Sequence, residues 1–163
     1  MRSVFKIFIA VMVCAFFLEG RAVAAPSGCD AIMLDKINAY RKANGVPALE
    51  YDEDLVRVAD VRVNELVVSF GHLRPDGNSY KTVYKELKLD NNYERGSENI
   101  AKVLDNWDFD KGSDEEYVDY IFEAYKCSES HNTNMLKPYW KYYGGSFITN
   151  YNGECYQIQV FAE

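Results

Sequence analysis

The chain has 163 residues, enough for one domain or two small ones and too few for two large catalytic lobes. Apolar residues make up 48% of the sequence and charged residues 26%, so the chain can bury a core and fold. Its 18 lysines and arginines against 25 aspartates and glutamates give a net charge of −7, which disfavours nucleic acid and anionic membrane surfaces as partners.

The N-terminal segment has the pattern of a secretory signal peptide. Two basic residues precede an apolar run at residues 7–18, and the small residues Ala-Val-Ala follow it. The apolar run is shorter than the roughly 20 residues that a membrane-spanning helix needs. We therefore predict a signal peptide over residues 1–24 and one domain over residues 25–163. We expect this domain to be secreted, either extracellular or in the cell envelope, and not to be an integral membrane protein.

Three cysteines remain once the predicted signal peptide is removed: Cys29, Cys127 and Cys155. An exported protein meets oxidising conditions in which disulfides persist. We favour a disulfide between Cys127 and Cys155 because both lie in the C-terminal half of the chain. Three cysteines allow three pairings, and three reduced thiols remain an alternative.

Helical periodicity dominates the first two thirds of the predicted domain. Asp30 is placed to cap a first helix that ends at Gly45, with inward positions at Met33, Ile37 and Tyr40. Three acidic residues at 52–54 begin a second helix that runs to about Phe70. Its inward stripe consists of Leu55, Val58, Ala59, Arg62 and Leu66.

The middle of the chain contains two weaker helices and an acidic loop. We predict a short helix within residues 79–89, after a turn at residues 75–77. Residues 105–114 carry four aspartates without regular ligand spacing, which indicates a solvated loop. A capping box formed by Ser113 and Glu116 then starts a helix that ends near Cys127.

The C-terminus changes to the two-residue period of β-strands. Residues 156–160 alternate apolar and polar side chains, and Asn152-Gly153 is a strong hairpin signal. Residues 142–149 form the partner strand, in which Gly144-Gly145 indicates a bulge or a close backbone approach. Helices followed by a hairpin predict an α+β domain with helices packed on an antiparallel sheet.

Three short motifs stand out in the chain: two contain its two histidines, and the third, between them in sequence, contains a glutamate. They are His-x-Arg-Pro-Asp-Gly from His72, Glu-Asn-Ile-Ala from Glu98, and Ser-x-x-His-x-x-Asn-x-Leu from Ser128. In this order they resemble the CAP superfamily of cysteine-rich secretory, antigen 5 and pathogenesis-related proteins (the SCP-like domain), in particular its short bacterial branch. The resemblance extends from about Leu34 to Phe161 and implies an α-β-α sandwich with a central cleft.

The resemblance also implies that two histidines and two glutamates converge in this cleft. Three of the four positions are present, as His72, Glu98 and His131. The position of the second glutamate falls on Ser128, and the nearby Glu123 and Glu129 are out of register. This departure weakens the case for an activity that needs two acids.

Two imidazoles and a carboxylate could bind zinc or another divalent ion and leave positions open. The favoured function is therefore an extracellular binding module whose cleft holds a divalent metal between His72, Glu98 and His131, with no catalytic residue assigned. Its ligand is left open between protein, lipid and glycan. The alternatives are a metal-dependent hydrolase with Glu98 as general base, a lipid-binding protein, and a hydrogen-bonded network without metal.

The segment 139–143 reads Tyr-Trp-Lys-Tyr-Tyr and follows the second histidine. We expect most of these aromatic residues to pack in the core or on the sheet. An alternative is an amphipathic binding surface, because tyrosine combines a large apolar face with a polar tip.

Overall fold

The structure is a computed structural model that describes residues 28–103 and 113–163. The predicted signal peptide and nearly all of the predicted loop at residues 105–114 lie outside the described residues. Within the two described stretches, no helix is both long enough and apolar enough to cross a membrane.

A four-stranded sheet forms the middle of the domain. Its strands are β1 (Glu50–Tyr51), β2 (Gly96–Val103), β3 (Tyr142–Thr149) and β4 (Cys155–Ala162), in the order β1-β3-β4-β2. The predicted hairpin is confirmed as β3 and β4, with Gly153 at a positive φ of 78° in the turn. The two-residue β1 pairs parallel to β3, and the other pairings are antiparallel.

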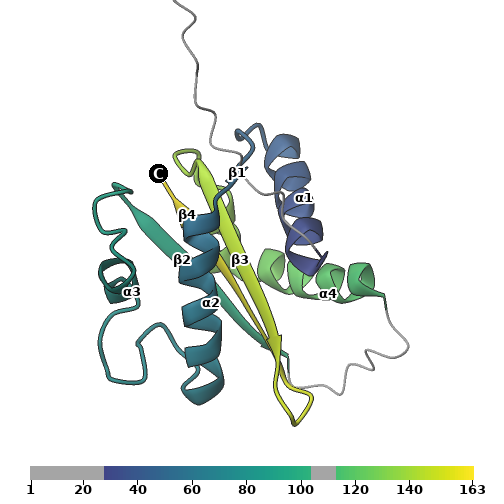
Figure 1. The fold of residues 1–163 in the computed structure, drawn as a ribbon. Helices are drawn as coiled ribbons and strands as arrows, with labels where there is room; N and C mark the ends of the chain where they lie inside the picture. The colour runs from purple at the N-terminus through teal and green to yellow at the C-terminus, as the bar shows by residue number, and fades with distance from the viewer. Residues whose placement is uncertain (1–27, 104–112) are drawn as a thin grey trace, which may run out of the picture.

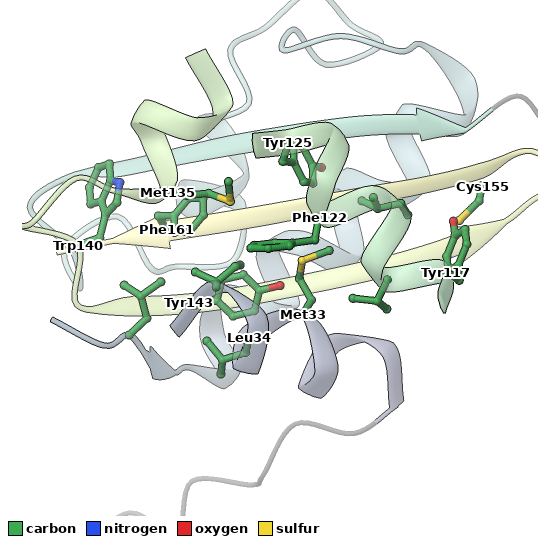
Figure 2. Close-up of a cluster of buried hydrophobic side chains, with 14 of the residues drawn as sticks. Met33, Leu34, Tyr117, Phe122, Tyr125, Met135, Trp140, Tyr143, Cys155 and Phe161 are labelled. Atoms are coloured by element: carbon green, nitrogen blue, oxygen red, sulfur yellow. The ribbon is translucent and has the colours of Figure 1, made fainter. Parts of the chain in front are cut away.

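Helices cover both faces of this sheet (Figure 1). On one face lie α2 (Glu53–Val68) and α3 (Thr82–Glu86), and on the other lie α1 (Gly28–Ala43) and α4 (Asp114–Cys127), with α5 (Glu129–Met135) following α4. Each face encloses its own cluster of buried apolar side chains, and Figure 2 shows the cluster on the α1 and α4 face. The expected α-β-α sandwich is confirmed.

The predicted starts of two helices, the second helix at residues 52–54 and the one after the capping box, are confirmed, and that of the first helix is wrong. Asp52 accepts hydrogen bonds from two backbone N–H groups at the start of α2, and Ser113 and Glu116 form the capping box of α4. In contrast, α1 begins at Gly28, before the predicted cap Asp30. The Asp30 carboxylate instead accepts a hydrogen bond of 2.9 Å from the Tyr143 hydroxyl, so it ties α1 to β3.

The glycine pair in β3 marks a close backbone approach and not a bulge. Gly144 and Gly145 continue the register of β3 against β4 without interruption. A Cβ atom on Gly144 would collide with the backbone of Leu55 and Val56 in α2. Glycine at this position therefore lets α2 lie directly on the sheet.

Candidate functional site

Glu98 is a buried carboxylate on β2 that faces α2, with 5% of its surface exposed. Arg62, fully buried on α2, holds both of its oxygens. The guanidinium donates from Nε to Oε2 and from Nη2 to Oε1, each at 3.0 Å. A bidentate pair of this kind fixes the orientation of the carboxylate as well as neutralising it.

His72 follows the end of α2 and lies against the same carboxylate. Its Nδ1 is 3.0 Å from Oε1 of Glu98, and its side chain is 56% exposed. Arg62 also donates to the carbonyl oxygen of Gly71 at 2.8 Å, which holds the backbone immediately before the histidine. An ionised carboxylate can only accept a hydrogen bond. The contact therefore favours the His72 tautomer that carries hydrogen on Nδ1 and leaves a lone pair free on Nε2.

A chain of ion pairs leads from Glu98 to the surface. Arg62 donates to Glu65 at 2.7 Å, Glu65 accepts from Arg74 at 2.8 Å, and Arg74 donates to the exposed Glu86 at 2.8 Å. Burial works against the charge of Arg62, but its hydrogen bonds to Glu98 and Glu65 outweigh this and raise the pKa of the guanidinium. Arg62 therefore stays charged although it is fully buried.

His131 is positioned by α5 and lies against the edge strand β2. Its ring meets the Tyr125 ring edge-to-face at 5.1 Å between centroids, and its carbonyl oxygen accepts a bond of 3.2 Å from Asn99. Burial, and secondly the charge of His72, lower the pKa of His131. The two histidines are thus electrostatically coupled, and the neutral imidazole that metals bind is favoured at position 131.

Neutral amide groups surround β2 on the face of α4 and α5. Asn99 donates to Gln159 at 2.9 Å and accepts from Asn134 at 3.0 Å, and the Trp140 indole donates to the Asn134 carbonyl at 3.0 Å. All four residues are buried. This network fixes the start of β2 and the segment that carries His131.

The model of the family "CAP: Cysteine-rich secretory protein family" matches residues 34–161. The chain belongs to the CAP family. Similar solved CAP-like folds include an outer surface protein of Borrelia burgdorferi, with 18% identity, a TM-score of 0.65, and coverage of 81% of this chain and 90% of the other. An extracellular SCP-domain protein of Bacillus anthracis has 18% identity, a TM-score of 0.63, and coverage of 83% of this chain and 40% of the other.

NaASP2, solved with Zn²⁺, has 12% identity and a TM-score of 0.58, with coverage of 85% of this chain and 83% of the other. A search of curated protein sequences found no match. At these identities the solved structures support the fold alone.

Of the three predicted site residues of this CAP domain, two are in contact and the third is not. Glu98 directly contacts His72, whereas within the described residues His131 contacts Tyr125 and Asn99 and forms no hydrogen bond, ion pair or ring contact with that pair. Both Glu98 oxygens already accept from Arg62. Among residues 28–103 and 113–163, no group of three or more His, Cys, Asp or Glu side chains is arranged to hold a metal ion.

The fourth CAP position carries no acid that faces the histidines. Ser128 ends α4, and its hydroxyl lies 3.3 Å from that of Ser130. Glu123 is exposed and pairs with Lys126 at 2.7 Å, and Glu129 is exposed at the start of α5. The departure of the sequence from the family pattern is therefore present in the structure as well.

Sequence analysis assigned no role to Arg62, although it placed this residue in the inward stripe of the second helix. An arginine within an apolar stripe must find buried acceptors, because an unpaired buried charge is very costly. That signal was enough to predict a buried ion pair, although none was predicted from the sequence. It did not identify Glu98, 36 residues away, as the partner.

The predicted disulfide between Cys127 and Cys155 is not formed. All three described cysteines are free thiols, and Figure 2 shows Cys155 beside Tyr117, near the start of α4. Cys127 is the last residue of that helix. At 1.5 Å per residue this places it about 15 Å from Tyr117, and disulfides need Cα atoms within about 7 Å. Their shared position in the C-terminal half did not bring these residues together in space.

Proposed function

We propose that this CAP domain is an extracellular binding module that holds a divalent ion such as zinc through His72 and His131. In this proposal Glu98 orients His72 from behind and is not itself a ligand. The observation that carries it is the contact from Glu98 to Nδ1 of His72, at 3.0 Å. Metal-binding histidines usually donate their other ring N–H to a carboxylate in this way.

The residues of this chain fit such an ion through their nitrogen chemistry. His72 keeps one ring nitrogen and more than half of its side-chain surface available. The lowered pKa of His131 favours its neutral, metal-binding form. The zinc in the solved structure of NaASP2 supports the choice of metal by likeness of fold.

Two imidazoles leave at least two positions of a tetrahedral ion to water or to a donor atom of a bound partner. This incompleteness favours binding over hydrolysis. A hydrolase would need a carboxylate free to accept a proton, and both oxygens of Glu98 are held by Arg62. The extracellular location is supported by the signal-peptide pattern at residues 1–24 and by the extracellular SCP-domain protein among the similar structures.

Calorimetric titration of the purified protein with zinc chloride tests the proposal. We expect micromolar binding that is lost in His72→Ala and in His131→Ala, with folding of each variant verified by circular dichroism. Glu98→Gln should weaken binding about 10- to 100-fold, as expected for an outer-shell partner. Cys127→Ser is the matched control, because this exposed thiol is another possible zinc ligand and its loss should change nothing. Zinc binding retained in a folded His72→Ala/His131→Ala variant would overturn the proposal.

A further inference from the structure

A second site lies beside the start of β2. A cavity of about 470 Å³ opens between the residues around α3, the connection into β2, and the segment 137–140 that precedes β3. Its volume falls within the roughly 300–1,000 Å³ of small-molecule sites. None of the three residues assigned to the metal site lines it.

Five aromatic residues contribute to the walls of this cavity. They are Tyr80, Tyr84, Tyr93, Tyr139 and Trp140. Tyr84 and Tyr93 meet edge-to-face at 6.1 Å between centroids, and Tyr139 and Trp140 do so at 4.6 Å. Such paired rings offer flat apolar surfaces that suit another ring system.

The wall formed by residues 137–140 is held from behind by a buried arginine. The Arg41 guanidinium, on α1, donates to the carbonyl oxygens of Met135 at 2.7 Å, Lys137 at 3.1 Å and Trp140 at 3.1 Å. These bonds fix the backbone that presents Tyr139 and Trp140. The cavity is therefore largely preformed, which lowers the entropy cost of binding.

The lining of the cavity is richer in cations, relative to acids, than the chain as a whole. Its lining includes the cations Lys81, Arg95 and Lys137 and the acids Asp90 and Glu94, whereas acids outnumber bases by 25 to 18 in the full sequence. Arg95 is partly neutralised by Glu163 at 3.0 Å. Lys81 and Lys137 form no ion pair within the described stretches of the chain. Lys137 Nζ lies over the Trp140 ring, 5.6 Å from its centroid, where its charge can meet an anion held against that ring.

We propose that this cavity binds a small organic anion built on a flat ring system. The ring lies among the tyrosines and Trp140, and its carboxylate or sulfonate pairs with Lys81 and Lys137. This inference is independent of metal binding, since the cavity shares no residue with the proposed metal site. Tyr80 links the two regions, because it lines the cavity and its ring lies 6.4 Å from that of His72.

The test compares 2-naphthoate with 2-naphthylmethanol, which keeps the ring system and lacks the charge. We expect calorimetry on the purified protein to give a Kd on the order of 1 mM or tighter for naphthoate. The alcohol should bind about ten-fold more weakly. Lys81→Gln/Lys137→Gln should weaken naphthoate binding about ten-fold, about three-fold for each exposed ion pair. Lys42→Gln, an exposed cation at the end of α1, is the matched control.

The role of the ring surface is tested with a second pair of variants. Tyr139→Ala removes part of the wall and should reduce naphthoate binding at least five-fold. Tyr151→Ala removes a tyrosine that is 96% exposed in the β3–β4 turn and should have no effect. The inference is overturned if naphthoate fails to bind, if the alcohol binds equally well, or if the folded Tyr139→Ala and double-lysine variants bind as the unaltered protein does.

Discussion

Two neighbouring polar side chains of β2, Glu98 and Asn99, are satisfied in different ways on the two faces of the sheet. On the α2 face, Glu98 belongs to a chain of full charges that ends at the exposed Glu86. On the α4 and α5 face, the next residue of the same strand, Asn99, belongs to a network of neutral amides. Successive side chains of a strand point to opposite faces of the sheet. The ion pairs around Glu98 and the amide network around Asn99 are therefore separated although the two residues are adjacent in β2.

This difference shows how a buried carboxylate and a buried amide are each stabilised. A buried carboxylate is stable where an arginine meets both of its oxygens and further ion pairs lead out to water. The amide network has no such outlet, and each of its dipoles is satisfied internally. On the α2 face, this chain of buried charges is in direct contact with an exposed histidine, His72.

The largest expected effect comes from breaking the charged pair. Arg62→Leu leaves Glu98 buried without its two charge-assisted hydrogen bonds. We expect the free energy of unfolding, measured by urea denaturation, to fall by about 3–5 kcal/mol.

Two further variants show whether this loss comes from the unpaired charge. Arg62→Leu/Glu98→Leu should recover most of the stability, because an apolar pair of similar volume replaces the buried ions. Arg57→Leu removes an exposed arginine that pairs with Asp54 and should cost less than about 1 kcal/mol. A comparably small loss in Arg62→Leu would contradict the assignment of Arg62 as the support of Glu98.

Alanine substitutions at the two glycines of β3 test how closely the chain packs on each face of the sheet. Gly144→Ala forces a methyl group into the α2 backbone and should cost about 3 kcal/mol in unfolding free energy. In Gly145→Ala the nearest atoms to the methyl group belong to the Asp30 and Tyr143 side chains, which can shift more than a backbone can, and we expect a smaller loss of about 1–2 kcal/mol. Equal losses in the two variants would show that α2 does not lie closer to the sheet than the opposite layer.

A smaller effect than that of the charged pair comes from Asp30, a buried carboxyl group without an arginine partner. Burial raises its pKa to about 6, against the hydrogen bonds from Tyr143 and Gly145. The native state then binds this proton more tightly than the unfolded chain does. Stability should therefore fall by about 2 kcal/mol as the pH rises from about 4 to about 6.5, and stay level above.

Urea denaturation of the unaltered protein and of Asp30→Asn across this pH range isolates the contribution of Asp30. The variant keeps an oxygen that can accept from Tyr143, so only the titration is removed. The difference in unfolding free energy between the two proteins should vary with pH. A constant difference would rule out the raised pKa.

Local signals in the sequence predicted much of the fold. The caps at Asp52 and Ser113 and the Asn152-Gly153 turn each act over a few residues, and the structure contains all three. Sequence analysis did not assign β2 as a strand, because this strand carries buried side chains on both faces and shows no clean alternation. It also missed α5, a seven-residue polar helix with two buried residues.

The sequence predicted which residues belong to the candidate site but not which of them contact one another. The family resemblance pointed to His72 and Glu98, and the structure brings them into contact. It could not show that Arg62 occupies both carboxylate oxygens, because that contact depends on how α2 packs on β2. Long-range pairing is what a single sequence leaves undetermined.

The position of β4 in the sheet has a consequence for biosynthesis. It follows the other strands along the chain, yet it lies between β3 and β2 and is β2's only partner in the described sheet. A ribosome must therefore complete residues 155–162 before the sheet can close, although most of the domain has already emerged. Until then the nascent chain lacks its central strand. If the signal peptide predicted at residues 1–24 directs export, such a delay would favour transport of the chain before its sheet is complete.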